Sequence, residues 1–450
     1  MEKDMTAGSP AKIILGFTIP IFIGNIFQQF YSMVDTIIVG KFVGTKALAA
    51  VGSTGTITFL ILGFLMGMTV GFTVLTAQRF GAGDLEGMRK TVGSAAVLSA
   101  AVSLIITVGS MVGMRPLLLF MNTPEDIFAD AYTYVMIICA GIFAQVLYNL
   151  LSCILRALGN SQTPLYFLIL AAGLNIVLDL LFIITFHMGV AGAAWATVIS
   201  QGVSGILCLF YIIKKVPQLH LKPYDWRPDG HLAKIQLNVG LPMALQYSIT
   251  AVGAMMMQSS LNLLGSLSVA AFTAANKIEQ VVTQAYVAMG TTMSTYCAQN
   301  TGAGNILRVR QGFRAATRMG ILYSVFAALL VMTTGKYMTY LFVSENVLDI
   351  MDSVDLYLKC VALFFIPLTI VNVYRNGIQG MGFGMLPMTA GIAELIGRGV
   401  TAMISAHYRS YFGVCLASPA AWILAGGLLL LMYYYILKHY YGEPFTRKRN

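Results

Sequence analysis

Four polar side chains interrupt an apolar stretch near the start of the chain, at intervals that place them on one side of a helix. The stretch runs from Pro20 to Gly44, and its polar residues are Asn25, Gln28, Ser32 and Asp35. Intervals of three and four residues bring side chains to one helical face. A carboxylate inside a membrane span costs about 2.5–3.5 kcal/mol by insertion scales, so such residues usually face a wet cavity and serve a function. We therefore predict that Asp35 belongs to a cation site.

A second acid lies in another apolar run. Asp179 follows Asn175 by one helical turn, and the next run offers Thr197 and Gln201, again one turn apart. Two carboxylates with amide and hydroxyl oxygens suit a hard cation such as Na⁺, or one shared proton. Asp35 and Asp179 would be metal ligands only if the ion is Na⁺.

Each acid also has a structural interpretation. Asp35 lies shortly before Gly40 and Lys41, where the span closes, so its side chain would reach the membrane interface. Asn175 and Asp179 would then be a hydrogen-bonded pair where two helices pack. The polar stripe on the first helix, and the presence of a second acid, favour the functional interpretation.

The composition is that of a polytopic membrane protein. Of 450 residues, 57% are hydrophobic and 10% are charged, whereas soluble domains are about 25% charged. The net charge of +10 comes from Lys and Arg in short connectors, which indicates topology signals and contacts with anionic lipid rather than nucleic-acid binding. The sequence contains no CxxC pair, histidine cluster, P-loop or hydrolase motif, so we expect no cofactor and no enzyme activity.

The apolar runs predict an all-α protein with twelve transmembrane helices of roughly 20–28 residues each. Lys and Arg concentrate in alternate connectors and in both tails, including Lys3 and Arg447. The positive-inside rule then places both termini in the cytoplasm of a multi-pass protein of the cell inner or plasma membrane.

The two halves of the sequence repeat each other. Residues 76–89 (TAQRFGAGDLEGMR) match 296–310, residues 155–165 match 378–388, and Pro20 matches Pro242 at an offset of 242 − 20 = 222. Six spans per half is an even number, so the repeats share one orientation and would be related by a pseudo-two-fold axis along the membrane normal. We predict an N-terminal six-helix bundle (1–213), a basic cytoplasmic linker (214–236) and a C-terminal six-helix bundle (237–450).

The repeat predicts that the cation site lies in the first half. At these offsets Asp35 maps to Met256 or Met257, and Asn175 and Asp179 map to Arg398 and Ala402. The paired acids are therefore absent from the second half.

Other residues are secondary candidates. Pro20 removes a backbone hydrogen bond and would act as a hinge or as a static kink. The candidates for a substrate cavity are Asn25, Gln28, Ser32, Gln201, Gln246, Met257 and Glu279. Glu394 and Arg398, one turn apart, fit a neutralised structural pair.

Three motifs together resemble the multidrug and toxic compound extrusion (MATE) family. They are Pro20 followed by DTIIVG from Asp35, the Gln-x-x-Gly-Ala-Gly connector from Gln78, and LRALGNSQTP from Leu155. The resemblance spans nearly the whole chain. It implies two six-helix bundles that export organic cations and other amphipathic compounds against Na⁺ or H⁺ by alternating access, and we expect a monomer.

Within that family the chain is similar to the DinF-like branch. The resemblance implies a cation-coupling site of Asp35, Asn175, Asp179 and Thr197, with Pro20 as the bending proline. Where the NorM-like branch has a glutamate in the seventh helix this chain has Gln246, and its tenth helix has no acid. Lys-Ile-Glu at 277–279 resembles an element of the family's eighth helix, which keeps Glu279 as a secondary candidate.

Two other functions deserve comparison. A lipid-linked-saccharide flippase of a related fold would need cavity cations for pyrophosphate, and the spans offer only Lys277, Arg375 and Arg398. Glu279 and Glu394 would neutralise two of these. An intramembrane enzyme or passive channel is disfavoured by the missing catalytic motifs and by the two-bundle repeat. The expected partners are a drug-like small molecule and membrane lipid.

Overall fold

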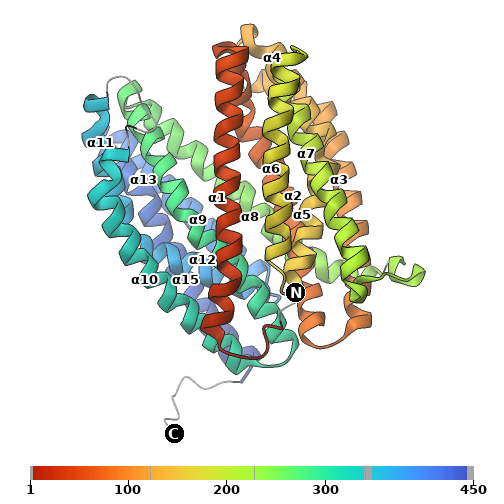
Figure 1. Cartoon of the computed structure of the whole chain (residues 1–450). Helices are drawn as coiled ribbons and strands as arrows, with labels where there is room; N and C mark the ends of the chain where they lie inside the picture. Colours follow the sequence, from red (N-terminus) through yellow and green to blue (C-terminus); the bar gives the residue numbers. More distant parts are fainter. Residues whose placement is uncertain (1–3, 122, 228, 339, 341–346, 443–450) are drawn as a thin grey trace. The chain divides into compact units, whose positions relative to one another are not determined.

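All the regular secondary structure in the described part of the chain is helical (Figure 1). The structure is a computed structural model that describes residues 4–121, 123–227, 229–338, 340 and 347–442. Helices satisfy every backbone donor and acceptor within one segment, which lipid demands. The outermost residues of the predicted basic tails, Lys3 and Arg447 among them, lie outside the described residues.

The first half contains six spans. They are α1 (Pro10–Ile38) with the π-helix η1 (Val39–Val43), α2 (Thr45–Gly81), α3 (Leu85–Phe120), the pair α4 (Glu125–Ala140) and α5 (Ile142–Ala157), α6 (Gln162–Leu180) with the π-helix η2 (Leu181–Thr185), and α7 (Val190–Lys215). The 3₁₀ turns η3 (Pro217–Leu219) and η4 (Pro223–Trp226) follow.

The second half repeats the pattern. Its spans are α8 (Gly230–Asn262), α9 (Ser266–Gly302), α10 (Ile306–Met338), the pair α11 (Val347–Ala362) and α12 (Phe365–Gly380), α13 (Met385–His407), and α14 (Tyr411–Cys415) with α15 (Ala417–Tyr440). Among the described residues, eight helices are long and apolar enough to cross a membrane, and each of two bent pairs adds one. The more polar α9 and α13 bring the total to the predicted twelve.

The two bent spans are equivalent in the repeat. The axis turns by 46° between α4 and α5, and by 51° between α11 and α12. The Gly-Ala-Gly connectors are equivalent too. Gly83 and Gly304 have φ values of +73° and +70°, a conformation that favours glycine. Asp84 and Asn305 then accept the backbone N–H groups of Gly87 and Arg308, which begins α3 and α10. This motif is therefore a turn and cap.

By packing, the chain divides into two units that differ from the sequence repeat in two places. Unit 1 comprises residues 1–4 and 19–248, and unit 2 comprises 5–18 and 249–450. The first turns of α1 thus pack with the second half of the sequence, and the first turns of α8 pack with the first half. The division into 1–213, 214–236 and 237–450 remains a prediction based on the repeat.

Hydrogen bonds fasten the first turns of α1 within unit 2. Thr18 donates to the Thr292 hydroxyl at 2.8 Å, and the backbone N–H of Met5 donates to Gln299 Oε1 at 3.0 Å. The Arg308 guanidinium donates to the carbonyl oxygens of Met5 and Gly8.

One buried amide fastens the first turns of α8 within unit 1. Gln236 Oε1 accepts from the Ser94 hydroxyl at 2.6 Å, and its Nε2 donates to the carbonyl oxygens of Phe72 and Thr91. These three bonds inside the protein compensate the cost of burying the amide.

Glycines let α2 and α8 approach closely beside this amide. A Cβ built at Gly71 would lie 2.3 Å from the Cα of Gly240, and one at Gly67 would lie 2.7 Å from the Cα of Ala244. Small residues allow such approach in membrane helices.

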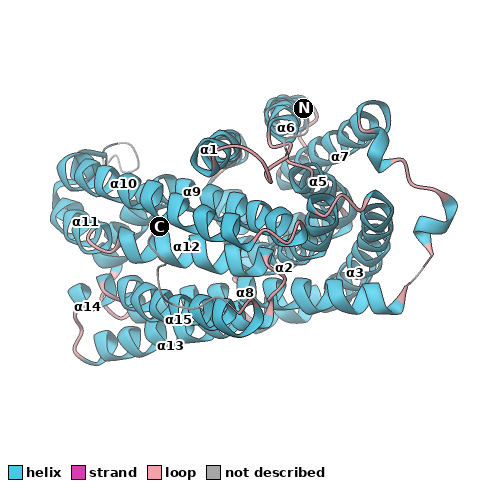
Figure 2. Ribbon diagram, turned by 90° about the horizontal axis from the view of Figure 1, so that it is seen from below, coloured by secondary structure: helices cyan, strands magenta, loops and turns pink. Residues whose placement is uncertain are grey.

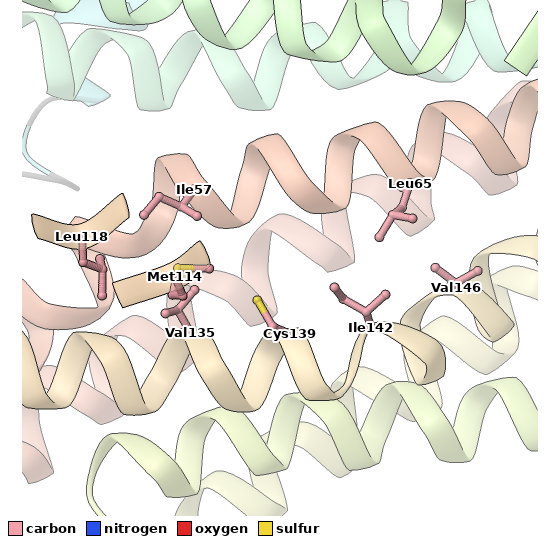
Figure 3. Close-up of a cluster of buried hydrophobic side chains, with 8 residues drawn as sticks. All are labelled: Ile57, Leu65, Met114, Leu118, Val135, Cys139, Ile142 and Val146. Atoms are coloured by element: carbon pink, nitrogen blue, oxygen red, sulfur yellow. The ribbon is translucent and has the colours of Figure 1, made fainter. Parts of the chain in front are cut away.

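The apolar core of unit 1 forms where α2, α3, α4 and α5 meet. Figure 3 shows its side chains, which are Ile57, Leu65, Met114, Leu118, Val135, Cys139, Ile142 and Val146. The bend after α4 falls inside this core, so α5 can still pack on α2.

Adding a methyl group at the α2–α8 contact should destabilise unit 1. We expect Gly71→Ala to lower the free energy of unfolding by about 1–3 kcal/mol, because the contacting atoms are backbone and cannot rotate away. All six cysteines are buried and free, so a thiol-reactive dye measures unfolding during heating.

Gly55→Ala is the matched control. It lies on the same helix, and nothing is within 4 Å of its Cβ position. An equal melting temperature for the two variants would contradict the close contact.

Candidate functional site

The structure brings the two predicted acids together within unit 1. Asp35 is carried by α1 and Asp179 by α6, and their carboxyl groups lie within hydrogen-bonding range of each other. Asp179 is 0% exposed and Asp35 is half-buried. The alternative in which Asp35 reaches the membrane interface on its own does not match this arrangement.

Both acid-bearing helices change to π-helix within a few residues of the acid. η1 begins at Val39, four residues after Asp35, and η2 begins at Leu181, two residues after Asp179. The two π-helices contact each other, and an apolar cluster surrounds them (Ile38, Val39, Ala47, Ile183, Val190 and Ala193). Single π-turns are frequent at functional sites, because they re-aim side chains within a helix.

Asn175 and Thr197 complete the predicted set. Asn175 is buried, and its Nδ2 donates to the Thr197 hydroxyl at 3.5 Å, a weak bond that links α6 to α7. Asn175 Oδ1 then remains without a donor, as do Asp35 Oδ1 and both carboxylate oxygens of Asp179. Buried acceptors without donors carry a desolvation cost that a proton or a cation would remove.

Sequence reasoning missed two tyrosines. Tyr31 lies beside Asp35 and is hydrogen-bonded to Gln201, and Tyr134 from α4 lies near both acids. Tyr31 precedes Asp35 by four residues, so helical spacing would have revealed it. Tyr134 belongs to no polar pattern, and only the packing of α4 brings it here.

The donor set suits a hard cation or a proton. It consists of carboxylate, amide and hydroxyl oxygens. Within the described residues no three or more His, Cys, Asp and Glu side chains gather as a metal-binding group. An oxygen set with two adjacent carboxylates can hold Na⁺ or share one proton.

The other members of the polar stripe are not buried with the acids. Asn25 is half-buried, whereas Gln28 and Ser32 are exposed. Pro20 is buried, and α1 continues through it as a single helix (Figure 1). A hinge at Pro20 stays a prediction.

In unit 2 the two glutamates of the candidate spans have partners. Glu394 accepts from Arg375 at 2.6 Å and from Arg398 at 3.0 Å, while Glu279 accepts from the Tyr357 hydroxyl at 2.5 Å. The predicted Glu394–Arg398 pair is confirmed, and Arg375 extends it. Of the cavity candidates, Met257 and Glu279 lie in unit 2 and are buried, whereas Gln246 lies on α8 within unit 1 and is half-buried.

Comparison with known proteins finds the same family in both halves of the chain. The MatE family model matches residues 20–181 and again residues 242–403. Both ends of the match are displaced by 222 residues (242 − 20 and 403 − 181), which is the offset of the predicted repeat. The chain belongs to the MatE family.

Relatives and solved structures are similar to this chain over most of its length. The chain is 33% identical over 385 residues to the "Probable multidrug resistance protein YpnP" of Bacillus subtilis, covering 85% of each. A crystal structure of MATE in complex with MaL6 superposes with a TM-score of 0.92 at 25% identity, covering 98% of this chain and 99% of the other. An outward-facing multidrug resistance MATE family transporter has a TM-score of 0.91 at 25% identity, covering 97% of each.

Family membership confirms the predicted fold class. The protein is an all-α, multi-pass membrane protein of twelve spans in two six-helix bundles, from a family of transporters rather than enzymes. The first match to MatE contains Asp35, Asn175 and Asp179. Assignment to the DinF-like branch remains a prediction.

Removing one partner of the buried ion cluster in unit 2 should lower the free energy of unfolding. We expect Arg375→Met to destabilise the protein by about 3–5 kcal/mol, because Glu394 would keep its charge with one cation fewer. The thiol-dye melting assay in detergent measures this.

Lys359→Met is the control, because its pair with Asp355 is solvent-accessible, with the lysine side chain 52% exposed. An exposed pair contributes about 0–1 kcal/mol. Equal losses in the two variants would show that Arg375 does not hold a buried charge.

Proposed function

We propose that the protein is a secondary active transporter that exports organic cations and amphipathic drug-like compounds in exchange for H⁺ or Na⁺. The observation that carries this proposal is the pairing of Asp35 with Asp179, whose buried oxygens lack hydrogen-bond donors. A bound cation would supply the missing positive partner. Its arrival and departure would then change the charge of this pair, which is how an ion gradient can drive a conformational change.

The substrate class is supported by the names of similar proteins. The Bacillus relative is called a probable multidrug resistance protein, and the outward-facing structure is described as a multidrug resistance transporter. We extend that class to this chain. The cation-coupled, alternating-access mechanism is our own inference from the acid pair.

The coupling would act through the carboxyl-terminal ends of α1 and α6. With the site open to the outside, Asp35 and Asp179 take up the cation and lose their mutual repulsion. The π-turns that follow the two acids then repack, α1 bends at Pro20, and the compound is released outside. Opening toward the cytoplasm discharges the cation. The ion shifts this equilibrium only by its differential affinity for the two states.

We place the transporter in the cell inner or plasma membrane as a monomer with both termini cytoplasmic. The support is the concentration of Lys and Arg in alternate connectors. This orientation puts the connector between α7 and α8 on the cytoplasmic side.

A flippase for lipid-linked saccharides is less well supported. Such a protein needs free cations to bind pyrophosphate, and two of the three span cations, Arg375 and Arg398, are bound to Glu394.

Neutral variants of the acid pair test the proposal. We expect Asp35→Asn and Asp179→Asn each to reduce gradient-driven transport of a fluorescent organic cation in proteoliposomes by about 5- to 150-fold, the range of coupling free energies of about 1–3 kcal/mol. Asp126→Asn should transport normally, because Asp126 is an exposed partner of Lys46. Unchanged transport by both acid variants would remove the pair from the mechanism.

Separate ion gradients identify the coupling ion. In proteoliposomes that contain the unaltered protein, one of the two gradients, pH or Na⁺, should by itself drive accumulation of the fluorescent cation. Asp35→Asn should reduce that response by the same factor as above. Equal accumulation with no gradient would indicate a passive pathway.

The hinge makes a separate prediction. Pro20→Ala restores the backbone donor to the Gly16 carbonyl and straightens the first helix. We expect slower transport with ion binding preserved. Pro116→Ala in the exposed last turns of α3 is the control and should leave transport unchanged. Full transport by Pro20→Ala would assign the proline a static role.

A further inference from the structure

The connector between α7 and α8 is fastened to the side of α3. It contains the 3₁₀ turns η3 and η4, and both turns contact α3. Figure 2 shows this connection passing around the outer side of α3 before α8 begins. The α7–α8 connector is therefore a packed element of unit 1, and not only a linker between the two halves of the sequence.

A buried carboxylate anchors η4. Asp225 is buried, and its Oδ2 accepts the backbone N–H of Lys222 at 2.8 Å and lies 3.7 Å from Arg89 Nε on α3. The carbonyl oxygen of Asp225 would be 2.2 Å from a Cβ at Gly93. The turn therefore rests directly on the helix backbone, and Gly93 is what permits the contact.

The anchored turn presents an aromatic–basic face, defined here as Lys90, Lys222, Tyr224, Trp226 and Arg227. Tyr224 is 38% and Trp226 48% exposed. Two ammonium groups flank the tyrosine ring, Lys222 at 5.7 Å and Lys90 at 5.9 Å from its centroid. These cation–π contacts hold the two ammonium groups beside the tyrosine ring.

The charge of this face is only partly balanced by its neighbours. Glu86 pairs with Lys90, and Asp229 accepts the first N–H groups of α8. Within the described residues, neither Lys222 nor Arg227 takes part in an ion pair. The face thus carries two exposed cations that are available to an anion.

The length of α3 indicates that the face lies at the height of a membrane interface. α3 has 36 residues, which is about 54 Å of helix, whereas the hydrocarbon core is about 30 Å thick. If the core is centred on α3, about 12 Å of helix extends beyond it at each end. Gly93 lies eight residues after Leu85. Eight residues span about 12 Å of helix, so Gly93 lies where α3 would enter the hydrocarbon core. Tyrosine and tryptophan concentrate at this level in membrane proteins.

The face continues a lipid-exposed stripe on the same helix. Val97, Leu104 and Val108 follow Gly93 at helical spacing and are exposed, Leu104 by 66%. In a membrane protein such a stripe contacts acyl chains, so the groups above it meet headgroups rather than a soluble partner.

We propose that the aromatic–basic face binds the headgroups of anionic phospholipids in the leaflet that borders the α7–α8 connector. Lys222 and Arg227 would pair with phosphate, while Tyr224 and Trp226 lie at the boundary between headgroups and acyl chains. Asp225 and Gly93 position the face without touching lipid. The lipid would hold the connector, and with it the start of α8, at a fixed depth.

Fluorescence of Trp226 tests the proposal independently of transport. The chain has three tryptophans, so Trp195→Phe with Trp422→Phe leaves Trp226 as the only one. This variant is placed in phosphatidylcholine nanodiscs with equal fractions of brominated phosphatidylglycerol or brominated phosphatidylcholine, with bromine near the head of the chain. We expect phosphatidylglycerol to quench Trp226 more strongly, and Lys222→Gln or Arg227→Gln to reduce that preference by about fivefold each.

Lys438→Gln is the matched control, since Lys438 is an exposed cation at the end of α15. It should keep the preference. Equal quenching by the two lipids, or a preference that survives both substitutions, overturns the proposal. Quenching by aqueous iodide with none by either lipid would place the face in water and overturn it as well. Failure of the ion-coupling proposal would change none of these readings.

Discussion

Two carboxylic acids held in one apolar region are the constraint on which the arrangement of unit 1 depends. Asp35 and Asp179 are brought together by α1 and α6, and three of their four carboxylate oxygens, Asp35 Oδ1 and both of Asp179, are buried without a hydrogen-bond donor among the described residues. Buried apolar residues pack around the two π-helices that follow the acids. In our proposal a positive charge or a proton balances the acids, and this links the occupancy of the site to the packing of both helices.

The repeat shows how one scaffold carries two different chemistries. Both halves have a bent fourth span, the same Gly-Ala-Gly turn and a proline at the same position. Among the described residues of the first half, Asp35 Oδ1 and both carboxylate oxygens of Asp179 have no donor. The second half gives Glu394 two arginines and gives Glu279 a tyrosine hydroxyl. A common backbone therefore supports an acid pair that lacks donors in one bundle and hydrogen-bonded or ion-paired glutamates in the other.

The first helix connects a region whose polar groups are hydrogen-bonded to the acid pair, whose buried oxygens lack donors. Its first turns, together with Met5 and Gly8, are hydrogen-bonded to α9 and α10 within unit 2. Its later turns belong to unit 1 and carry Asp35. Pro20 lies just after the boundary between them. The helix thus has one end hydrogen-bonded within unit 2 and carries Asp35 in unit 1, with Pro20 between the two. This placement is why we propose Pro20 as the bending point.

The sequence by itself determined the spans, their repeat, and the acids with their closest helical neighbours. These follow from local rules, because hydropathy marks a span and a spacing of three or four residues marks a helical face. Only the tertiary structure decided that Tyr134 approaches the acids, that Arg375 pairs with Glu394, and that the α7–α8 connector rests on α3 at Gly93. These contacts join residues of different helices. No periodicity encodes them, since they depend on which faces pack and at what height along each helix.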